Sequence, residues 1–313
     1  MRLFTAAALS ALLALPVLPA LAQSFEEGLT AVQRGDFATA LKHFEPLAEQ
    51  GNAIAQFGLG VMYANGDGVV QDYSEAAKWY RLAAEQGDAD AQLKLSIMYE
   101  DGRGVAQDEA EALKWNRRAA EQGHVIAQIG LGYMYESGDG VVQDYSEAAK
   151  WYRFAAEQGH VIAQFRVGVM NEFGKGVTQD YSEAIKWYRL AAEQGNENAQ
   201  LRLGLLYDSG NGVAQNYSQA AKWHRLAAEQ GNENAQLMLG MLYESGDGIA
   251  RNPVLAYTLL NLAAAQGNEN ARKYRDIMLK SLTSEQINEG QRLASEWKIG
   301  TPLPTTRDVT TWP

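Results

Sequence analysis

Histidines and carboxylates are the residues of this sequence that could hold a metal ion or transfer protons. The histidines are His43, His124, His160 and His224. No two of them stand four residues apart, as a zinc pair on one helical face would. The carboxylates mostly stand three or four residues from a basic residue, as Glu75 does from Lys78, which is typical of a solvated helix face. No serine or threonine lies in a recognisable nucleophile elbow. We therefore expect no metal, no cofactor and no enzyme activity.

The Gly-Asp-Gly loops at 66–72 and 138–144 faintly resemble calcium-binding loops. An EF-hand loop needs alternating oxygen ligands and a distal bidentate glutamate, whereas glycines alternate here. The same Gly-x-Gly is not a nucleotide-binding fingerprint, because no strand precedes it. Glycine readily takes the positive φ that ends a helix and turns the chain, so we interpret both loops as helix–helix turns.

These loops belong to a repeat of 36 residues. A glycine closes an AEQG-like segment once per period, at Gly51, Gly87, Gly123, Gly159, Gly195, Gly231 and Gly267. A fixed period in this range is typical of a stacked solenoid. Solenoids present long surfaces rather than deep catalytic pockets, so the period favours a binding protein over an enzyme.

Each repeat contains two predicted helices. In residues 51–86, Asn52 can cap a first helix whose apolar or small residues recur every four positions from Ala55. Asp72 can cap the second helix, because its side-chain oxygen can accept hydrogen bonds from the first backbone N–H groups. The corresponding second-helix caps are Asp108, Asp144, Asp180, Asn216 and Asn252.

Small residues recur inside both predicted helices. Glycine stands in the middle of the first helix in every copy except one, which has Ser96. Each such glycine costs about 1 kcal/mol relative to alanine, so its recurrence indicates a close helix–helix approach. We expect the tryptophans of the second helices to fill the wider gaps. The glycines are Gly60, Gly132, Gly168, Gly204 and Gly240, and the tryptophans are Trp79, Trp115, Trp151, Trp187 and Trp223.

The first 22 residues have the pattern of a secretory signal peptide. Arg2 precedes an apolar run with two prolines, and Ala20-Leu21-Ala22 forms an A-x-A cleavage signal. A membrane anchor is the alternative, because the run is near the roughly 20 residues that a span needs. We expect cleavage after Ala22 and a periplasmic or secreted mature chain. The absence of cysteine excludes a cysteine-linked lipid anchor and any disulfide.

The composition restricts the partners. The 313 residues include 27 Lys and Arg against 38 Asp and Glu, a net charge of −11. Binding to nucleic acid depends on neutralising phosphates with basic residues, so we expect neither nucleic acid nor an anionic membrane as a partner. No later stretch reaches the length of a membrane span, so we expect none after cleavage, and we expect a monomer.

The period also gives the domain organisation. Residues 23–50 form a predicted N-terminal capping helix pair, 267–298 form C-terminal capping helices, and 299–313 form a flexible tail. Between the caps lie six repeats, at 51–86, 87–122, 123–158, 159–194, 195–230 and 231–266.

The repeat resembles the Sel-one-like repeat, a relative of the tetratricopeptide repeat. The pattern A-x-x-x-L-G-x-x-Y-x-x-G-x-G-V, then D-x-x-x-A, then W-Y-x-x-A-A-x-Q-G, recurs in six full copies over roughly residues 37 to 297. The departures are Ser96, Asn116, Asn171, His224 and Leu259. The resemblance implies an all-α, right-handed superhelical solenoid of helix-turn-helix repeats that acts as an adaptor or scaffold, often through its inner groove. Some exported relatives are linked with host factors, the envelope, or β-lactam binding and hydrolysis.

Positions that vary between copies are free of the shared packing. Four such positions on each first helix are spaced 0, 4, 7 and 11, which places them on one helical side. We call this set the first-helix face. Its members are Ile54, Gly58, Val61, Asn65, Asp90, Lys94, Ile97, Asp101, Ile126, Gly130, Tyr133, Ser137, Ile162, Arg166, Val169, Phe173, Asn198, Arg202, Leu205, Ser209, Asn234, Met238, Met241 and Ser245.

We expect the middle of the first-helix face to bind a protein partner. Tyr133, Arg166 and Phe173 are its best anchors, because aromatic residues and arginine are the usual hot-spot types. Neutral drift is the alternative explanation of the variation. Two other functions stay open: an envelope glycan-binding protein, and a β-lactam-binding or hydrolysing enzyme. The candidate partner-binding residues are Lys94, Ile97, Tyr133, Ser137, Arg166, Val169, Phe173, Arg202 and Leu205.

Overall fold

The computed structural model describes residues 19–305 and 308–309, and in these ranges it contains sixteen helices and no strand. The predicted leader, residues 1–22, lies mostly outside the described residues. None of the described helices is both long and apolar enough to span a membrane. The chain divides into two compact units, Met1–Phe154 and Ala155–Pro313.

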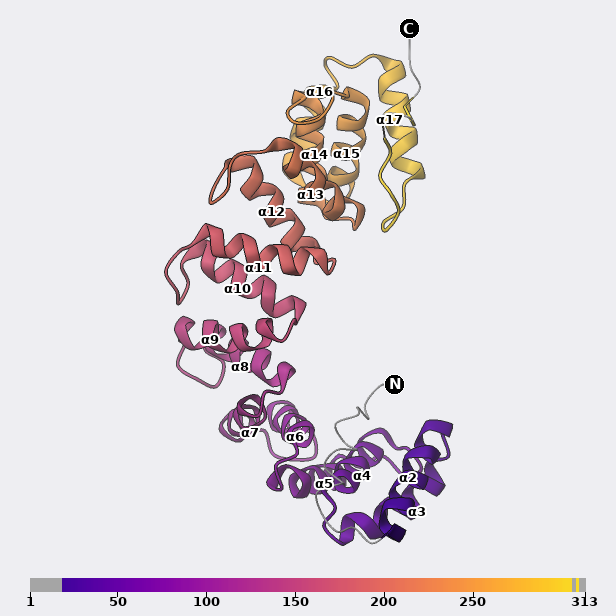
Figure 1. The fold of residues 1–313 in the computed structure, drawn as a ribbon. Coiled ribbons are helices and arrows are strands. Elements are labelled where there is room, and N and C mark those ends of the chain that lie inside the picture. The colour runs from indigo at the N-terminus through magenta and orange to yellow at the C-terminus, as the bar shows by residue number, and fades with distance from the viewer. Residues whose placement is uncertain (1–18, 306–307, 310–313) are drawn as a thin grey trace. The chain divides into compact units, whose positions relative to one another are not determined.

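Unit 1 is a tandem array of antiparallel helix pairs (Figure 1). Each helix is followed by its partner across a short turn, and consecutive pairs contact each other. Helix α9 (Tyr145–Glu157) contains the boundary with the next unit. The helices before it are α2 (Pro19–Arg34), α3 (Phe37–Glu49), α4 (Ala53–Asn65), α5 (Tyr73–Glu85), α6 (Ala89–Asp101), α7 (Glu109–Glu121) and α8 (Val125–Ser137).

Unit 2 continues the same arrangement and ends in two further helices. Its paired helices are α10 (Val161–Phe173), α11 (Tyr181–Glu193), α12 (Glu197–Ser209), α13 (Tyr217–Glu229), α14 (Glu233–Ser245) and α15 (Pro253–Ala265), and the last two are α16 (Glu269–Met278) and α17 (Ser284–Glu296). The fold is therefore the all-α solenoid of helix pairs that the period predicts.

The helix ends follow the local sequence. Asn52 Oδ1 accepts a hydrogen bond from the N–H of Ala55 at 3.0 Å and begins α4. Gly66 ends it with a left-handed φ of 82° and donates its N–H to the carbonyl of Met62. Asp72 accepts from the N–H groups of Ser74 and Glu75 and begins α5. The remaining second-helix caps predicted above likewise accept backbone N–H groups, which confirms them.

The recurrent mid-helix glycines lie under a side chain of the second helix, which confirms the predicted close approach. A Cβ atom at Gly132 would lie 2.6 Å from the ring of Tyr152. The five tryptophans are buried to different extents. Trp115 and Trp151 are buried, but the other three tryptophans are partly exposed. The space over the glycine is filled by the residue after tryptophan, whose side chain points at the glycine. These residues are Tyr80, Tyr152, Tyr188 and His224, all buried.

Two polar ladders connect successive helices within each unit. Gln92 on α6 donates Nε2 to the carbonyl of Ala84 at 3.0 Å and accepts from Nε2 of Gln122 at 2.8 Å. Equivalent glutamines donate to an alanine carbonyl eight residues earlier. Other pairs of glutamines 30 residues apart form the same side-chain hydrogen bond. In the second ladder, Arg117 on α7 donates to the hydroxyl of Tyr135 on α8 at 2.5 Å. Buried hydrogen bonds of this kind fix how each pair docks on the next.

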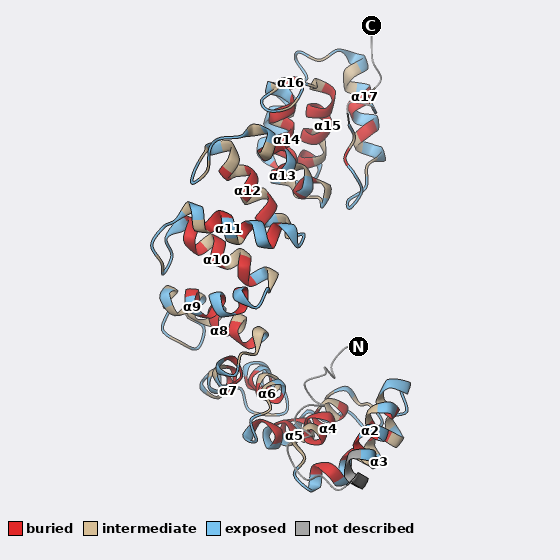
Figure 2. Ribbon diagram, in the orientation of Figure 1, coloured by how far each residue is buried: buried red, intermediate tan, exposed pale blue. Residues whose placement is uncertain are grey.

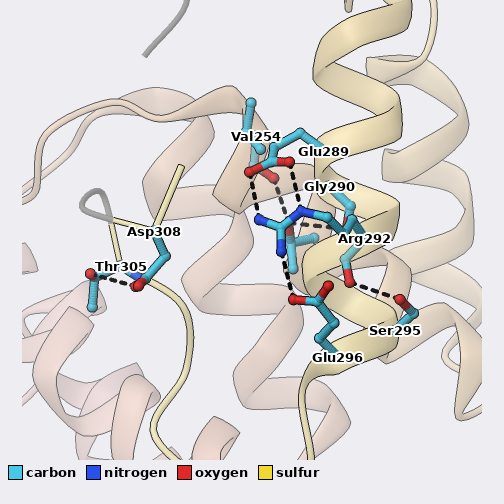
Figure 3. Close-up of polar contacts among 9 residues, drawn as sticks. Val254, Glu289, Gly290, Arg292, Ser295, Glu296, Thr305 and Asp308 are labelled. Carbon is cyan, nitrogen blue, oxygen red and sulfur yellow. Dashed lines mark hydrogen bonds and ion pairs between the residues drawn. The ribbon is translucent and has the colours of Figure 1, made fainter. Parts of the chain in front are cut away.

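The C-terminal helices cover α15, as its apolar sequence requires. Thr258 of α15 is fully buried, and its hydroxyl lies 3.4 Å from the carbonyl of Gly290 on α17. Figure 3 shows Arg292 between two carboxylates of the same helix. It donates two hydrogen bonds to Glu289, at 2.8 and 2.9 Å, and one to Glu296 at 2.6 Å.

The beginning of the expected flexible tail differs from the prediction. Gly300 donates its N–H to the carbonyl of Glu229 at 2.8 Å, and Leu303 donates to Oε1 of the same residue at 3.1 Å. Leu303 is only 3% exposed, because it joins the apolar cluster of α13 to α17. The segment therefore continues the C-terminal cap through these contacts. Residues 306–307 and 310–313 lie outside the described part.

Candidate protein-interaction face

The first-helix face is open to solvent throughout the array. All of its 24 members except Gly58 are exposed or partly exposed. The residues that repeat on the same helices, such as Ala55 and Leu59, are fully buried. Figure 2 shows this division along each helix, with buried sides toward the partner helix. The positions that vary are thus the positions that a partner can reach.

In unit 1, the first-helix face lines a hollow of about 180 Å³. Val61 and Asn65 come from α4, and Lys94, Ile97 and Asp101 come from α6. Lys94 and Ile97 are two of the predicted site residues, and the structure brings them together in this hollow. An apolar floor beside a lysine and a carboxylate can accept a side chain with both apolar and polar parts.

Tyr133 and Ser137 lie on α8, also in unit 1. Tyr133 is 53% exposed, which leaves about half of its side chain available to a partner. Ser137 instead satisfies its hydroxyl locally, by donating to the carbonyl of Tyr133 at 2.9 Å and contacting Asp139 at 2.7 Å. Tyr133 is therefore the stronger candidate of the two.

In unit 2, Phe173 and Arg202 contact each other. The guanidinium carbon of Arg202 lies 5.2 Å from the centroid of the Phe173 ring, a cation–π distance. Nη1 of Arg202 is also 3.4 Å from Oε1 of Glu172. These contacts hold the arginine over a ring that is itself 49% exposed, so the pair offers a preorganised flat cation and an aromatic surface.

Glu172 is a functional candidate that the sequence did not reveal. Its side chain is 11% exposed, and its Oε2 accepts the hydroxyl of Tyr188 at 2.5 Å. Burial and this carboxylate raise the pKa of Tyr188 well above its usual range, so the phenol stays protonated. The same contact recurs between residues 16 apart in other repeats: Tyr152 contacts Glu136 at 2.8 Å, and His224 contacts Asp208 at 2.7 Å. This recurring spacing is the sequence signal that could have identified Glu172.

The other predicted residues of unit 2 are partly exposed. Arg166 and Val169 lie on α10, and Leu205 lies on α12. Val169 packs against the apolar cluster formed by α11 and α12, so part of its side chain belongs to the core. The unit 2 site therefore centres on Phe173 and Arg202.

The structure also shows where the candidate metal ligands lie. Among the described residues, no group of three or more histidines and carboxylates could hold a metal ion. His124 begins α8, where Nδ1 accepts from the N–H of Ala127 at 3.3 Å and Nε2 lies 3.2 Å from Asp90. His160 stands at the start of α10 without a side-chain capping bond. His224 is fully buried against Gly204.

Comparison with protein families agrees with this geometry. The Sel1 repeat matches seven consecutive segments, residues 20–52, 53–88, 89–124, 125–160, 161–196, 198–232 and 234–268. The chain belongs to the Sel1 repeat family. The first segment covers the helix pair α2–α3. Proteins of this family are helical scaffolds for protein interaction.

Two solved structures extend the comparison. A protective antigen of uropathogenic Escherichia coli with an SLR fold is 37% identical, with a TM-score of 0.78 over 88% of this chain and 61% of that chain. This chain thus spans less than two thirds of that protein. A Sel1 repeat protein from Oxalobacter formigenes is 35% identical, with a TM-score of 0.62 over 77% of this chain and 96% of that one. Comparison with curated proteins found no match.

Proposed function

We propose that this protein is an exported scaffold that binds another protein through the first-helix face. The observation that carries the proposal is the division of each first helix into a repeating buried side and a varying exposed side. A surface under no shared packing constraint can diverge toward one partner.

The residue types favour a protein as the partner. The anchors are the exposed Tyr133 and Phe173 and the partly exposed Arg202, and tyrosine and arginine are enriched at protein-binding hot spots. The chain is acidic, so a nucleic acid would meet net repulsion. No convergent nucleophile and base supports catalysis at this face.

Export is the second part of the proposal. It rests on the leader pattern of residues 1–22 and the A-x-A signal before Gln23. A mature chain released into the periplasm or medium, without cysteine, would depend on packing alone for its stability. We also propose that it works as a monomer.

Charge reversal tests the binding face. The variant carries Lys94→Glu, Arg166→Glu and Arg202→Glu, and the experiment is affinity capture from the envelope fraction of the source cell with residues 23–313. We expect the native chain to retain a protein that the variant loses. A matched control, Lys78→Glu with Lys114→Glu and Lys186→Glu, makes the same charge change on the second helices, where each lysine forms an ion pair with the glutamate three residues earlier.

The outcomes distinguish the candidate functions. Retention by the control but not by the charge-reversed variant supports the first-helix face. Equal retention by all three chains would place the partner elsewhere. Binding of isolated cell-wall glycan with no protein retained would replace the adaptor by the envelope-binding alternative, and turnover of nitrocefin would indicate a β-lactam hydrolase.

A further inference from the structure

We propose that a hollow at the C-terminal end of unit 2 binds a partner segment that presents a large apolar side chain beside a lysine or arginine. This inference rests on the proposed scaffold function and names the chemistry of one part of its partner. The hollow has a volume of about 470 Å³, within the range of about 300–1,000 Å³ that is usual for binding pockets.

Apolar side chains from three elements form the hollow. Met238, Met241 and Leu242 come from α14, Leu260 comes from α15, and Tyr274, Ile277 and Met278 come from α16. Methionine is unbranched and polarizable, so it adapts to apolar groups of different shape.

Two of these side chains are exposed although they are large and apolar. Ile277 is 61% exposed and Tyr274 is 44% exposed. They stand on the same helix, three residues apart, at the edge of the hollow. Contiguous exposed apolar surface of this kind marks an interaction site, and the exposed rim can close over a bound side chain.

The polar part of the hollow is acidic. Asp208, Glu244 and Asp247 line it, and none of its thirteen lining residues is a lysine or an arginine. Glu244 lies 3.7 Å from Arg251, but both side chains are at least half exposed, so this ion pair is weak. The carboxylates therefore favour a basic group on the occupant and disfavour an acidic one.

Asp208 has a further unused acceptor. Its Oδ2 is 2.7 Å from Nε2 of the buried His224, while its buried Oδ1 has no hydrogen-bond donor among the described residues. A buried acceptor without a donor is unfavourable, because the loss of its hydration is not compensated. The Asp208 carboxylate thus adds to the acidic lining of the hollow.

The acidic and apolar hollow forms in unit 2 because the array ends there. Met238 and Met241 occupy positions that hold Arg202 and Leu205 one repeat earlier. Helix α16 replaces the first helix of a further full repeat and supplies Tyr274 and Ile277. The acidic hollow is therefore distinct from the cationic Arg202–Phe173 pair of the proposed function.

The test uses the full mature chain and synthetic peptides. The probe is a 12-residue peptide with Lys-Phe-Leu-Lys at its centre, and its controls replace both lysines by glutamate or both apolar residues by serine. Binding is followed through the methyl NMR signals of ¹³C-labelled methionine. We expect the probe to shift Met238, Met241 and Met278 and to leave Met62, Met98, Met134 and Met170 unchanged. Each control peptide should bind at least about tenfold more weakly.

A charge swap makes the test specific. Glu244→Lys with Asp247→Lys changes two exposed residues outside the core, and it should reverse the preference, so that the glutamate peptide binds better than the lysine peptide. Absence of shifts at the three methionines, or equal binding of the lysine and glutamate peptides, would overturn the inference. Ile277→Ser should weaken the probe without changing the fold, because this side chain is exposed.

The two proposals fail separately. If the charge-swapped chain and the native chain capture the same protein equally, while the probe does not bind, this inference is wrong and the scaffold function stands. If the Lys94, Arg166 and Arg202 variant captures normally but the charge-swapped chain captures nothing, the hollow is the binding site and the part of the first-helix face around those three residues is not.

Discussion

A Cβ atom at Gly60 would lie 2.5 Å from Cδ1 of Tyr80, so the ring of α5 occupies the space that any larger residue of α4 would need. The same relationship holds between Gly168 and Tyr188. In the one copy with serine in place of glycine, Ser96, the facing position holds the smaller Asn116. Ser96 donates its hydroxyl to the carbonyl of Ala112 at 2.8 Å, and Asn116 donates Nδ2 to the sulfur of Met134 at 3.6 Å.

This contact predicts opposite effects for two glycines of α4. Gly60→Ala should destabilise unit 1 by about 1–3 kcal/mol, because it forces the Tyr80 ring aside. Gly58→Ala meets only the ring of Phe44 at 3.4 Å, an ordinary contact, so it should be neutral or stabilising by up to about 1 kcal/mol. Urea unfolding of both variants checks this, and equal destabilisation would contradict the close approach.

The glutamine ladder predicts a second stability effect. Gln92→Ala should cost about 1–3 kcal/mol, because it removes two hydrogen bonds of a buried side chain, one to the carbonyl of Ala84 and one from Nε2 of Gln122. Gln107→Ala is the control, since the side chain of Gln107 is exposed and should change stability by less than about 0.5 kcal/mol. Thermal unfolding of the two variants measures this difference. Equal unfolding midpoints would show that the glutamine ladder does not contribute to stability.

The buried phenol of Tyr80 predicts alkaline instability. Burial raises the pKa of Tyr80 above the value of about 10 that tyrosine has in an unfolded chain. Its contribution to stability is therefore fully present below about pH 10 and is lost as the pH rises toward the folded pKa. Native and Tyr80→Phe chains should differ little at pH 7, and the variant should lose less stability at pH 11. A parallel loss in both chains would refute this linkage.

The docked beginning of the C-terminal segment predicts a local effect. Leu303→Ala should weaken the contact with Glu229, because it removes the buried anchor of the segment. Hydrogen exchange at the amide of Gly300 should then accelerate while the amides of α14 stay protected. Pro302→Ala, at an exposed neighbour, is the control. Fast exchange at Gly300 in the native chain would show that the segment is not docked.

The helix pairs were predictable because each signal is local. Asn52 and Asp72 reach only their own first turns, and Gly66 needs a positive φ that other residues disfavour. The first-helix face followed from comparing copies, since exposed positions vary and packed positions repeat. Because the sequence repeats every 36 residues, each of these local patterns recurs in several copies, which makes the prediction more secure.

The remaining features depend on contacts between helices that the spacing alone does not give. Tyr80 rather than Trp79 faces the glycine because of how α5 is rotated on α4. The burial of Glu172 depends on Tyr188 and Arg202, which come from two other helices. The acidic hollow requires α16, whose position over Met241 has no counterpart among the six repeats.

The central claim is that the varying side of the first helices touches the partner. Photocrosslinking in the source cell tests it directly, with p-benzoylphenylalanine placed singly at Tyr133 and Phe173, and at Leu82 and Leu190 on the exposed side of the second helices. The account predicts one shared crosslinked protein at Tyr133 and Phe173 and none at the other two positions. Crosslinks at Leu82 and Leu190 alone would contradict it and move the binding surface to the second helices.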